Sequence, residues 1–238
     1  MIDTKLAVVI STYQRKDGKT PFYLKRALDC VFEQTYRNFK VFLIGDKYED
    51  NDEIQLLVSE YNKDKLYFEN LPYAKERDNY TSKWVLWSYG GVNAVNIGIE
   101  KAISEDFEFI CHLDHDDWWL PNHLEEIIKC INITQSDWIC TKSTYNNPFN
   151  TLPSINSDEE YIPFHPKSSC LIHSSVCMNF KKIPLRYRDI YDETQQMGLP
   201  ADADLWERTR EFIFQNNLKS YYINKLTCRH DEEGYERI

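Results

Sequence analysis

Residues 109–119 read Phe-Ile-Cys-His-Leu-Asp-His-Asp-Asp-Trp-Trp. The apolar run Phe107–Leu113 has the length and composition of a buried strand, and it ends directly on the carboxylates of Asp114, Asp116 and Asp117. Like charges this close repel one another, and a cation held jointly by Asp114 and Asp116 would remove that cost. Carboxylate oxygens suit Mg²⁺ or Mn²⁺, which often bind a substrate phosphate as well. The competing interpretation is a solvated acidic turn before a helix.

The rest of the N-terminal half alternates between buried strands and amphipathic helices. Each strand is a short apolar run that ends in polar residues, and each helix carries apolar residues at helical spacing. The expected strands are Leu6–Ile10, Phe39–Ile44, Leu66–Phe68 and Phe107–Leu113, with helices that begin at Thr20-Pro21, Asn51 and Gly90-Gly91. Residues 72–89 lack a clear period and are expected to form an ordered loop over the sheet edge. This order predicts an α/β fold with a mostly parallel, Rossmann-like central sheet flanked by helices.

The C-terminal half is less regular. A helix is expected from Pro121, and a stronger one from Leu199-Pro200 to about Gln215. The other expected elements are a strand at Trp138–Thr141, a loop or hairpin at Asn146–Pro166, a strand at Cys170–Ile172, a short helix at Ser174–Phe180 and a strand at Tyr221–Ile223. The sequence shows no linker, so residues 1–238 are expected to form a single domain.

Composition excludes several classes of protein. A hydrophobic content of 42% is enough for a packed core, and a net charge of −10 disfavours nucleic acid or an anionic membrane as the partner. The seven cysteines are scattered and form no Cys-x-x-Cys pair, which indicates free thiols in a reducing compartment. No signal peptide and no transmembrane segment is recognised in the sequence. We therefore expect a soluble, cytoplasmic protein.

Polar residues follow three of the expected strands. Ser11, Thr12 and Tyr13 follow the first strand, Asp46 follows the second, and the acidic cluster follows the fourth. In a parallel sheet, ligands bind outside the carboxyl ends of the strands. The Tyr13 ring could stack on a base, and Asp46 could accept a hydrogen bond from the base or a ribose hydroxyl. This pattern predicts a nucleoside site.

Several segments together resemble the family 2 nucleotide-sugar glycosyltransferases of the GT-A fold. The similar segments are Val8–Arg15 (Val-Val-Ile-Ser-Thr-Tyr-Gln-Arg), Leu24–Lys40, Gly91–Ile99, Leu113–Pro121 and Ala201–Arg208. The fourth is similar to the family's D-x-D motif, and the last to its Glu-Asp-x-x-Leu-x-x-Arg motif. The resemblance implies a GT-A fold with a small antiparallel portion on the acceptor side. Residues 1–117 would form the nucleotide-sugar-binding half, and residues 118–238 the acceptor-side half.

The resemblance also implies residue roles. Asp114 and Asp116 would ligate Mn²⁺ or Mg²⁺ that bridges the donor diphosphate, with His230 as a candidate third ligand, and Asp202 would be the catalytic base. The residues implied for nucleotide-sugar binding are Ser11, Thr12, Tyr13, Arg15, Asp46, Asn96, Asp114, His115 and Asp116. Candidates for contact with the sugar or the acceptor are Asp117, Trp118, Trp119 and His173.

Two departures from the family pattern leave alternatives open. Asn96 is followed by Ile97 where the family usually has Arg, and Ala201 stands where it has Glu, so Asp204 is a rival for the base. Each candidate also has a structural interpretation. Asp202 and Asp204 could be ordinary first-turn carboxylates, and His230 could be a solvated histidine of the tail.

The expected function is metal-dependent transfer of a hexose from a nucleotide-diphosphate sugar to a hydroxyl of a glycan, protein or small molecule. The resemblance favours a UDP-hexose such as UDP-glucose as the donor, and attack in line with the leaving group implies inversion of the anomeric centre. One alternative is a sugar-phosphate nucleotidyltransferase, which usually has a glycine-rich loop after the first strand. Here the loop Thr12–Thr20 contains a single glycine, Gly18. The other alternative is a non-catalytic domain that binds sugar nucleotides or glycans.

Overall fold

A single mixed β-sheet organises the molecule. The computed structural model describes residues 4–189 and 198–230, and within them ten strands join in one sheet. The main path runs β3 (Leu66–Asn70), β2 (Phe39–Gly45), β1 (Leu6–Thr12), β4 (Phe109–His112), β9 (Val176–Asn179), β6 (Trp138–Thr144), β10 (Ser220–Arg229) and β5 (Trp118–Trp119). Two short strands complete it, because β7 (Thr151–Leu152) pairs with β6 and β8 (Tyr161–Pro163) pairs with β10.

The direction of the strands confirms the predicted α/β class. Strands β3, β2, β1 and β4 are parallel neighbours. Strand β9 is antiparallel to both β4 and β6, so β6 and its parallel neighbour β10 run the same way as the first four strands. The antiparallel strands β5, β7, β8 and β9 all come from the second half of the chain. Both halves therefore contribute to one mostly parallel sheet with a small antiparallel part.

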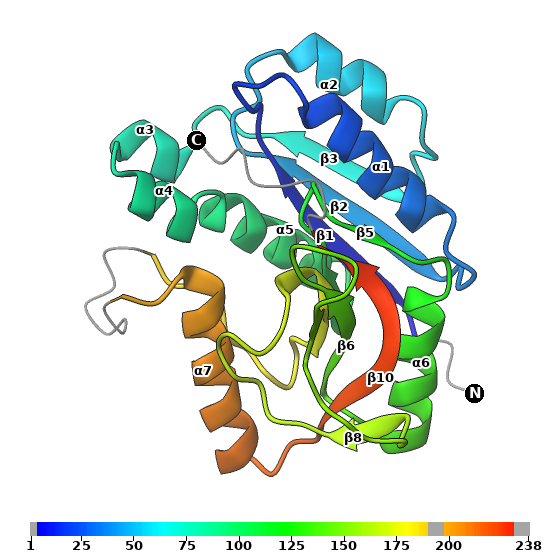
Figure 1. The fold of residues 1–238 in the computed structure, drawn as a ribbon. Helices are drawn as coiled ribbons and strands as arrows, with labels where there is room; N and C mark the ends of the chain where they lie inside the picture. Colours follow the sequence, from blue (N-terminus) through cyan, green and yellow to red (C-terminus); the bar gives the residue numbers. More distant parts are fainter. Residues whose placement is uncertain (1–3, 190–197, 231–238) are drawn as a thin grey trace.

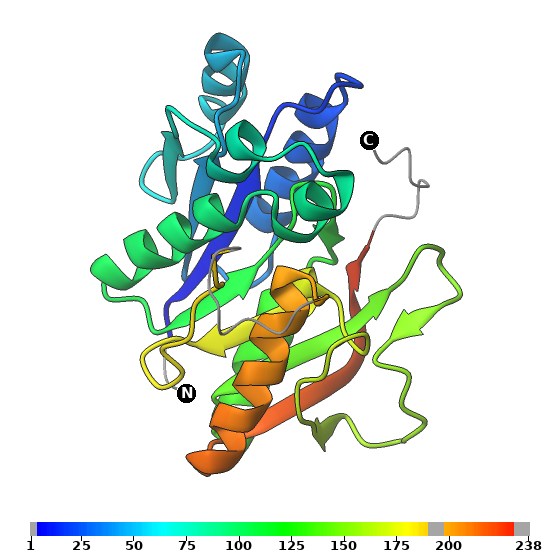
Figure 2. The ribbon, with the colours of Figure 1, turned by 90° about the vertical axis from the view of Figure 1, so that its left-hand side faces the viewer.

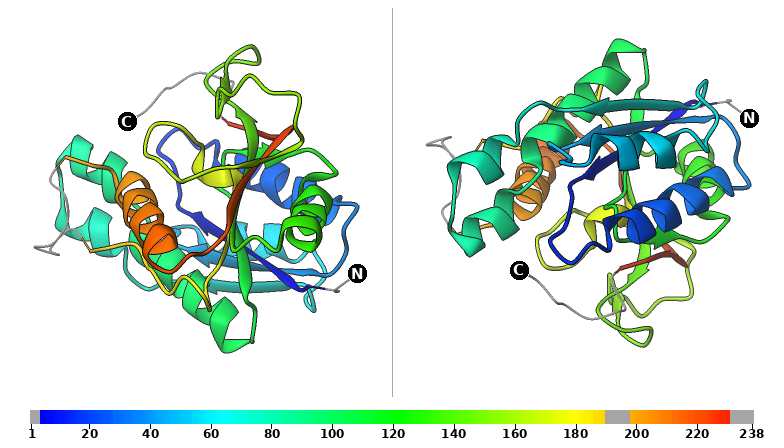
Figure 3. Two further views of the ribbon diagram at one scale, coloured as in Figure 1. Left: turned by 90° about the horizontal axis from the view of Figure 1, so that it is seen from below. Right: turned by 90° about the horizontal axis from the view of Figure 1, so that it is seen from above.

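Helices cover both faces of the sheet (Figures 1 and 3). One face packs against α1 (Thr20–Phe32), α2 (Asn51–Val58) and α6 (His123–Thr134), and the other against α5 (Val92–Ser104) and α7 (Ala201–Gln215). Figure 2 shows α5 and α7 on the same side of the sheet. The alternating side chains of β1 explain the two cores, since Leu6, Val8 and Ile10 face the first set of helices while Ala7 and Val9 face the second.

Helix α5 approaches the sheet closely, and two glycines make this possible. A Cβ added to Gly98 would lie 2.7 Å from the Val9 side chain, so only glycine fits there. Gly91 precedes the helix with a φ of 84°, a conformation that L side chains rarely adopt, and it lies beside Ser11 at the end of β1. The N-terminus of α5 is thereby held next to the carboxyl end of the first strand.

Two predicted segments differ from the structure. Cys170–Ile172 is not a strand, and Ser174–Phe180 is not a helix: a 3₁₀ turn η1 (His173–Ser175) leads into β9. The apolar run Val176–Met178 is too short for its periodicity to distinguish helix from strand, and its pairing with β4 and β6 decides the outcome.

The segment 72–89, predicted to be an ordered loop, is partly helical. It contains two short helices, α3 (Lys75–Asn79) and α4 (Lys83–Tyr89), and the side chain of Ser82 caps the second. They lie together beside the N-terminal end of α5 (Figure 1). None of the helices in the described ranges is both long and apolar enough to cross a bilayer. Each cysteine of the chain lies in the described ranges and is a free thiol.

Candidate active site

The polar residues predicted to meet at one sheet edge do so. In the parallel register of β1 with β2, Thr12 lies opposite Gly45, and in that of β1 with β4, Val9 lies opposite His112. The chain leaves all three strands at this edge, so Tyr13, Asp46 and the acidic cluster follow at neighbouring positions. The backbone N–H of Asp46 donates to the carbonyl of Thr12 (2.7 Å), which extends the pairing into the site.

Two arginines hold Asp116, the middle residue of the acidic cluster. Arg15, from the loop after β1, pairs through Nη1 with Oδ2 of Asp116 (3.3 Å) and through Nη2 with Asp17 (3.0 Å). Arg26 of α1 donates to the backbone carbonyl of Asp116 (2.6 Å), and its guanidinium lies 3.9 Å from the centroid of the Trp118 ring. Arg15 therefore pairs with the carboxylate of Asp116, and Arg26 fixes its backbone from a second element.

A histidine on the η1 turn holds the first carboxylate. Nδ1 of His173 lies 2.9 Å from Oδ1 of Asp114, and Nε2 lies 2.6 Å from the hydroxyl of Tyr187. Burial opposes ionisation of both groups. The charge of His173 nevertheless lowers the pKa of Asp114 below its usual range, and that of Asp114 raises the pKa of His173. The pair therefore favours an ionised Asp114.

The third carboxylate is fully buried and has its own partners. The hydroxyl of Ser174 donates to Oδ2 of Asp117 (2.5 Å) and accepts from the backbone N–H of Asp114 (2.9 Å). Nδ1 of His230, just after β10, lies 3.0 Å from Oδ1 of Asp117. Burial opposes the charge of His230, but Asp117 raises its pKa to about 9. His230 is therefore an ion-pair partner of Asp117, and the charges of Asp114 and Asp116 act on it from further away.

Protein groups thus offset the repulsion that the sequence argument assigned to a metal. Arg15, His173 and His230 each pair with one carboxylate of the cluster. The repulsion among the carboxylates therefore does not require a cation, and a metal would bind the carboxylate oxygens that these groups leave available.

The remaining oxygens fit a divalent ion. Oδ2 of Asp114 and Oδ1 of Asp116 take part in none of these contacts, and their side chains are 39% and 31% exposed. Among residues 4–189 and 198–230, no three His, Cys, Asp or Glu side chains gather closely enough to hold a metal by themselves. Mg²⁺ and Mn²⁺ commonly use one or two carboxylates and complete their coordination with water and substrate phosphates. The donor set therefore suits an ion that arrives with a diphosphate.

Tyr13, Asp46 and Arg77 form the other end of the site. Nε of Arg77 lies 3.1 Å from Oδ2 of Asp46, and its guanidinium lies 5.2 Å from the centroid of the Tyr13 ring. His115 packs edge-on against Tyr13, with 5.4 Å between the ring centroids. Burial raises the pKa of Asp46, and Arg77 opposes this shift. A flat ring, a carboxylate and a cation thus lie together, and such groups can stack on a planar ligand and form hydrogen bonds with it.

Three of the expected contact residues are placed for other tasks. Both ends of the Asn96 amide bind the backbone of Tyr187 (2.9 and 3.2 Å), so this side chain positions the segment that carries Tyr187. Trp119 is 2% exposed, stacks on His123 and donates from Nε1 to the carbonyl of Ser174 (2.7 Å), so its ring cannot face a sugar. The expected role of Trp119 is wrong because burial excludes it. Trp118 is half-buried under Arg26.

The two candidate bases differ sharply. Asp204 is buried and pairs with Arg208 (2.8 Å) and Arg188 (3.5 Å), so its charge stabilises the packing of α7. Asp202 is only partly buried and accepts a hydrogen bond from the backbone N–H of Ala203 (2.8 Å) in the first turn of the same helix. The negative charge of Asp202 acts on both His173 and Tyr187, which places Asp202 on the His173 side of the acidic cluster.

Several residues that shape this site were not predicted from the sequence in their observed roles. Arg77 and Tyr187 lie in segments without a recognised motif, and Ser174, expected at the start of a short helix, binds Asp117 instead. Arg26 did lie in a segment recognised as family-like, but its helical position gave no sign of its contact with Asp116. All four contact residues that are distant in the sequence, so only the charge or the hydroxyl group of their side chains could have suggested a role.

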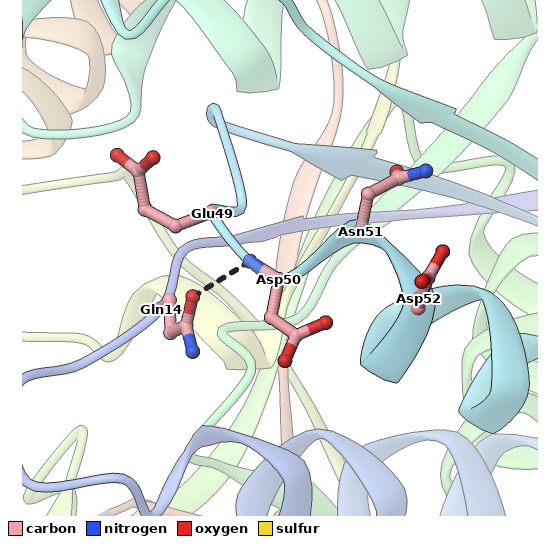
Figure 4. A pocket seen from close by; sticks show the side chains of 5 residues that line it. All are labelled: Gln14, Glu49, Asp50, Asn51 and Asp52. Carbon is pink, nitrogen blue, oxygen red and sulfur yellow. Dashed lines mark hydrogen bonds between the residues drawn. The ribbon is translucent and has the colours of Figure 1, made fainter.

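A separate open pocket lies beside the site and has the wrong charge for a diphosphate. Its lining consists of Gln14, Glu49, Asp50, Asn51 and Asp52 (Figure 4). The side chain of Gln14 accepts a hydrogen bond from the backbone N–H of Asp50 (2.9 Å), which ties the loop after β1 to the start of α2. Three carboxylates would repel a phosphate group, so this pocket is not the diphosphate site.

The match to a family model decides the identity. The model described as "Glycosyl transferase family 2" matches residues 7–195, which include the strand ends and the acidic cluster. The chain belongs to glycosyltransferase family 2. This glycosyltransferase is 38% identical over 241 aligned residues to the uncharacterized glycosyltransferase R139 of Acanthamoeba polyphaga mimivirus, covering 98% of this chain and 96% of that protein.

Solved structures show the same fold. TarS residues 1–349 from S. aureus, in complex with UDP-GlcNAc, aligns with a TM-score of 0.66 at 14% identity, covering 98% of the glycosyltransferase and 60% of that chain. The mannosyltransferase PcManGT from Pyrobaculum calidifontis, in complex with GDP-Man and Mn²⁺, aligns with a TM-score of 0.59 at 10% identity, covering 98% and 58%. The glycosyltransferase therefore spans about three fifths of each of these chains. The predicted GT-A fold is confirmed.

Proposed function

We propose that this family 2 enzyme transfers a hexose from a nucleotide-diphosphate sugar to a hydroxyl acceptor, with a divalent cation at Asp114 and Asp116. One observation carries the proposal: the acidic cluster, the Tyr13–Asp46 end and the first turn of α7 all converge at the carboxyl edge of the sheet. Tyr13, Asp46 and Arg77 would hold the nucleoside, supported by Ser11, Thr12 and His115. A UDP-hexose such as UDP-glucose is the proposed donor.

The protein groups around the diphosphate have separate tasks. A bound Mn²⁺ or Mg²⁺ would stabilise the negative charge that develops on the leaving diphosphate. Arg15 and Arg26 hold the Asp116 segment in place from two sides. His173 pairs with Oδ1 of Asp114 and Ser174 binds its backbone N–H, which leaves Oδ2 available for the ion. The carboxylates of Asp114 and Asp116 would therefore already be in position to bind the cation before the donor binds.

Asp202 is the proposed general base. It lies in the first turn of α7, where the helix N-terminus favours negative charge, and it is less buried than Asp204. A base that removes the proton of the acceptor hydroxyl on the face opposite the leaving group gives inversion at the anomeric carbon. The half of the chain after residue 117 would then provide the acceptor side of a single domain.

Thermal shift combined with a donor assay tests the proposal. UDP, GDP and their hexose conjugates are screened with and without MnCl₂, because a ligand that binds only the folded state raises the melting temperature. Labelled UDP-glucose is then incubated with Mn²⁺ and candidate acceptors. Binding with no hydrolysis or transfer under any condition would favour a non-catalytic binding module. The absence of nucleotide binding would overturn the proposal.

A further inference from the structure

Four buried polar atoms at the nucleoside end have no hydrogen-bond partner among the described residues. They are Oγ1 of Thr12, Oδ1 of Asp46, Oε2 of Glu76 and Nδ2 of Asn93. They belong to the ends of β1 and β2, to α3 and to the first turn of α5. Buried polar groups are normally paired, because leaving one unpaired costs about 1–3 kcal/mol. A cluster of both donors and acceptors therefore indicates a polar ligand.

Glu76 is the member of this cluster that the sequence argument did not consider. Its side chain is 4% exposed, and Oε1 accepts the backbone N–H of Asn93 (3.1 Å). Helix α5 has no side-chain cap of its own at Gly91, so this contact caps the helix from outside. One oxygen of Glu76 is thereby fixed at the N-terminus of α5, and the second oxygen has no hydrogen-bond partner within residues 4–189 and 198–230.

Asp46 and Glu76 differ in how they carry charge. Asp46 pairs with Arg77, which favours its ionised form. Burial, reinforced by the nearby charge of Asp46, raises the pKa of Glu76 to about 7. Below about pH 7 the two carboxyl groups thus supply one acceptor, Oδ1 of Asp46, and one O–H donor, on Glu76.

We propose that Glu76 recognises the donor base together with Asp46, so that Asp46 accepts a ring N–H and Glu76 donates to the adjacent ring carbonyl. This inference rests on the proposed function, because it assigns the nucleoside of the same donor. A ring N–H beside a C=O group is the edge that uracil presents. Guanine presents the same pattern, whereas neutral cytosine and adenine carry an unprotonated ring nitrogen there. Glu76 is therefore a specificity-determining residue for uridine or guanosine donors.

The protonation of Glu76 can be tested, because its charged neighbours are identified and a variant without a titratable group is available. Helix α5 contributes the backbone N–H of Asn93 at this point. The ionisable residues at the end of β2, on α3 itself and at the start of α4 are Asp46, Lys75, Arg77, Asp78 and Lys83. Glu76→Gln keeps an N–H donor and an oxygen acceptor at every pH, so this variant imitates the protonated carboxyl.

Calorimetric titration of the full chain with UDP and MnCl₂ tests the inference. From about pH 6 to about pH 8.5, we expect the affinity of the native protein for UDP to fall about tenfold relative to Glu76→Gln, because Glu76 loses its proton. Glu76→Ala should bind UDP about tenfold more weakly at the lower pH. Pyrophosphate with MnCl₂ lacks a base, so both variants should bind it as the native protein does. Glu69→Gln on β3 is the matched control.

Each outcome has a distinct meaning. Weakened UDP binding with unchanged pyrophosphate binding, and tighter binding of UDP or GDP than of CDP or ADP, would support the inference. Parallel pH profiles of the native protein and Glu76→Gln would overturn it, and so would equal losses for UDP and pyrophosphate in Glu76→Ala. A native protein that binds none of the four nucleotides would overturn the proposed function itself. Melting temperatures of the variants identify any loss of folding.

Discussion

Nδ1 of His173 lies 2.9 Å from Oδ1 of Asp114, although the two residues are 59 positions apart in the sequence. The contact exists because β9, which follows His173, inserts beside β4, which precedes Asp114. A side chain on one strand connection thereby fixes the carboxylate on another. This is how metal ligands are usually oriented, by a partner that binds the oxygen facing away from the ion.

Replacing His173 should therefore weaken metal–nucleotide binding. His173→Ala removes the hydrogen bond that orients Asp114, and we expect the affinity for Mn²⁺·UDP to fall about 10- to 100-fold. Tyr187→Phe removes only the hydroxyl beyond the imidazole, so its effect should be smaller. Titration calorimetry measures both affinities, with the exposed His165→Ala as the control. Unchanged affinity in His173→Ala would show that Asp114 needs no such support.

Asp116 should be essential for turnover but not for folding. Its side chain is 31% exposed and its ion pair with Arg15 is 3.3 Å long, so Asp116→Ala should cost no more than about 1 kcal/mol of stability. The loss of a ligand at the diphosphate should lower donor turnover by at least about 100-fold. Turnover of labelled UDP-glucose and the melting temperature are compared with those of the exposed Asp64→Asn. Full activity of Asp116→Ala would exclude the proposed metal site.

Substitutions of Asp202 and Asp204, the two carboxylates in the first turn of α7, should have different effects on activity and stability. Asp202→Asn should lower kcat by about 100- to 10,000-fold while UDP affinity and melting temperature stay the same, because only a proton acceptor is lost. Asp204→Asn breaks the buried pair with Arg208 and should cost about 3 kcal/mol of folding free energy. Urea unfolding and steady-state kinetics measure the two effects. The opposite pattern, an inactive but stable Asp204→Asn, would make Asp204 the base.

His123 should make the folded protein sensitive to acid. It is fully buried, stacked on Trp119 and hydrogen-bonded to Thr227, and burial lowers its pKa to about 3. The unfolded chain binds a proton at His123 below about pH 6.5, while the folded protein stays neutral there, so the free energy of unfolding falls as the pH falls. Between about pH 6.5 and pH 4.5 this histidine should account for a loss of about 2–3 kcal/mol.

His123→Phe provides the comparison. The variant keeps the aromatic contact with Trp119 but cannot take up a proton, so its unfolding free energy should change less with pH than that of the native protein. In the variant the hydroxyl of Thr227 loses its partner, His123. This loss changes the free energy of unfolding by the same amount at every pH, so it does not affect the slope. Urea unfolding from about pH 7 to about pH 4.5 gives both slopes. Identical slopes would mean that His123 is protonated in the folded state.

Local patterns in the sequence were sufficient for the parts that depend on near neighbours. The apolar run before Asp114 predicted a strand end, and Gly91 marked the start of α5. Alternation of strands and helices predicted the parallel sheet, and parallel strands necessarily leave from one edge. For this reason the sequence alone predicts that Tyr13 and Asp46 lie beside the acidic cluster, as they do in the structure.

Tertiary structure decided the partners of those residues. Asp117 meets His230 across 113 positions, and Glu76 reaches the start of α5 from a helix that has no clear period in the sequence. Strand β9 exists because β4 and β6 supply its hydrogen bonds on both sides. Such contacts depend on how distant segments pack, and a short polar or apolar run does not determine which segment will pack against it. The sequence therefore determined the residue types of the site, whereas the tertiary structure decided their pairing and burial.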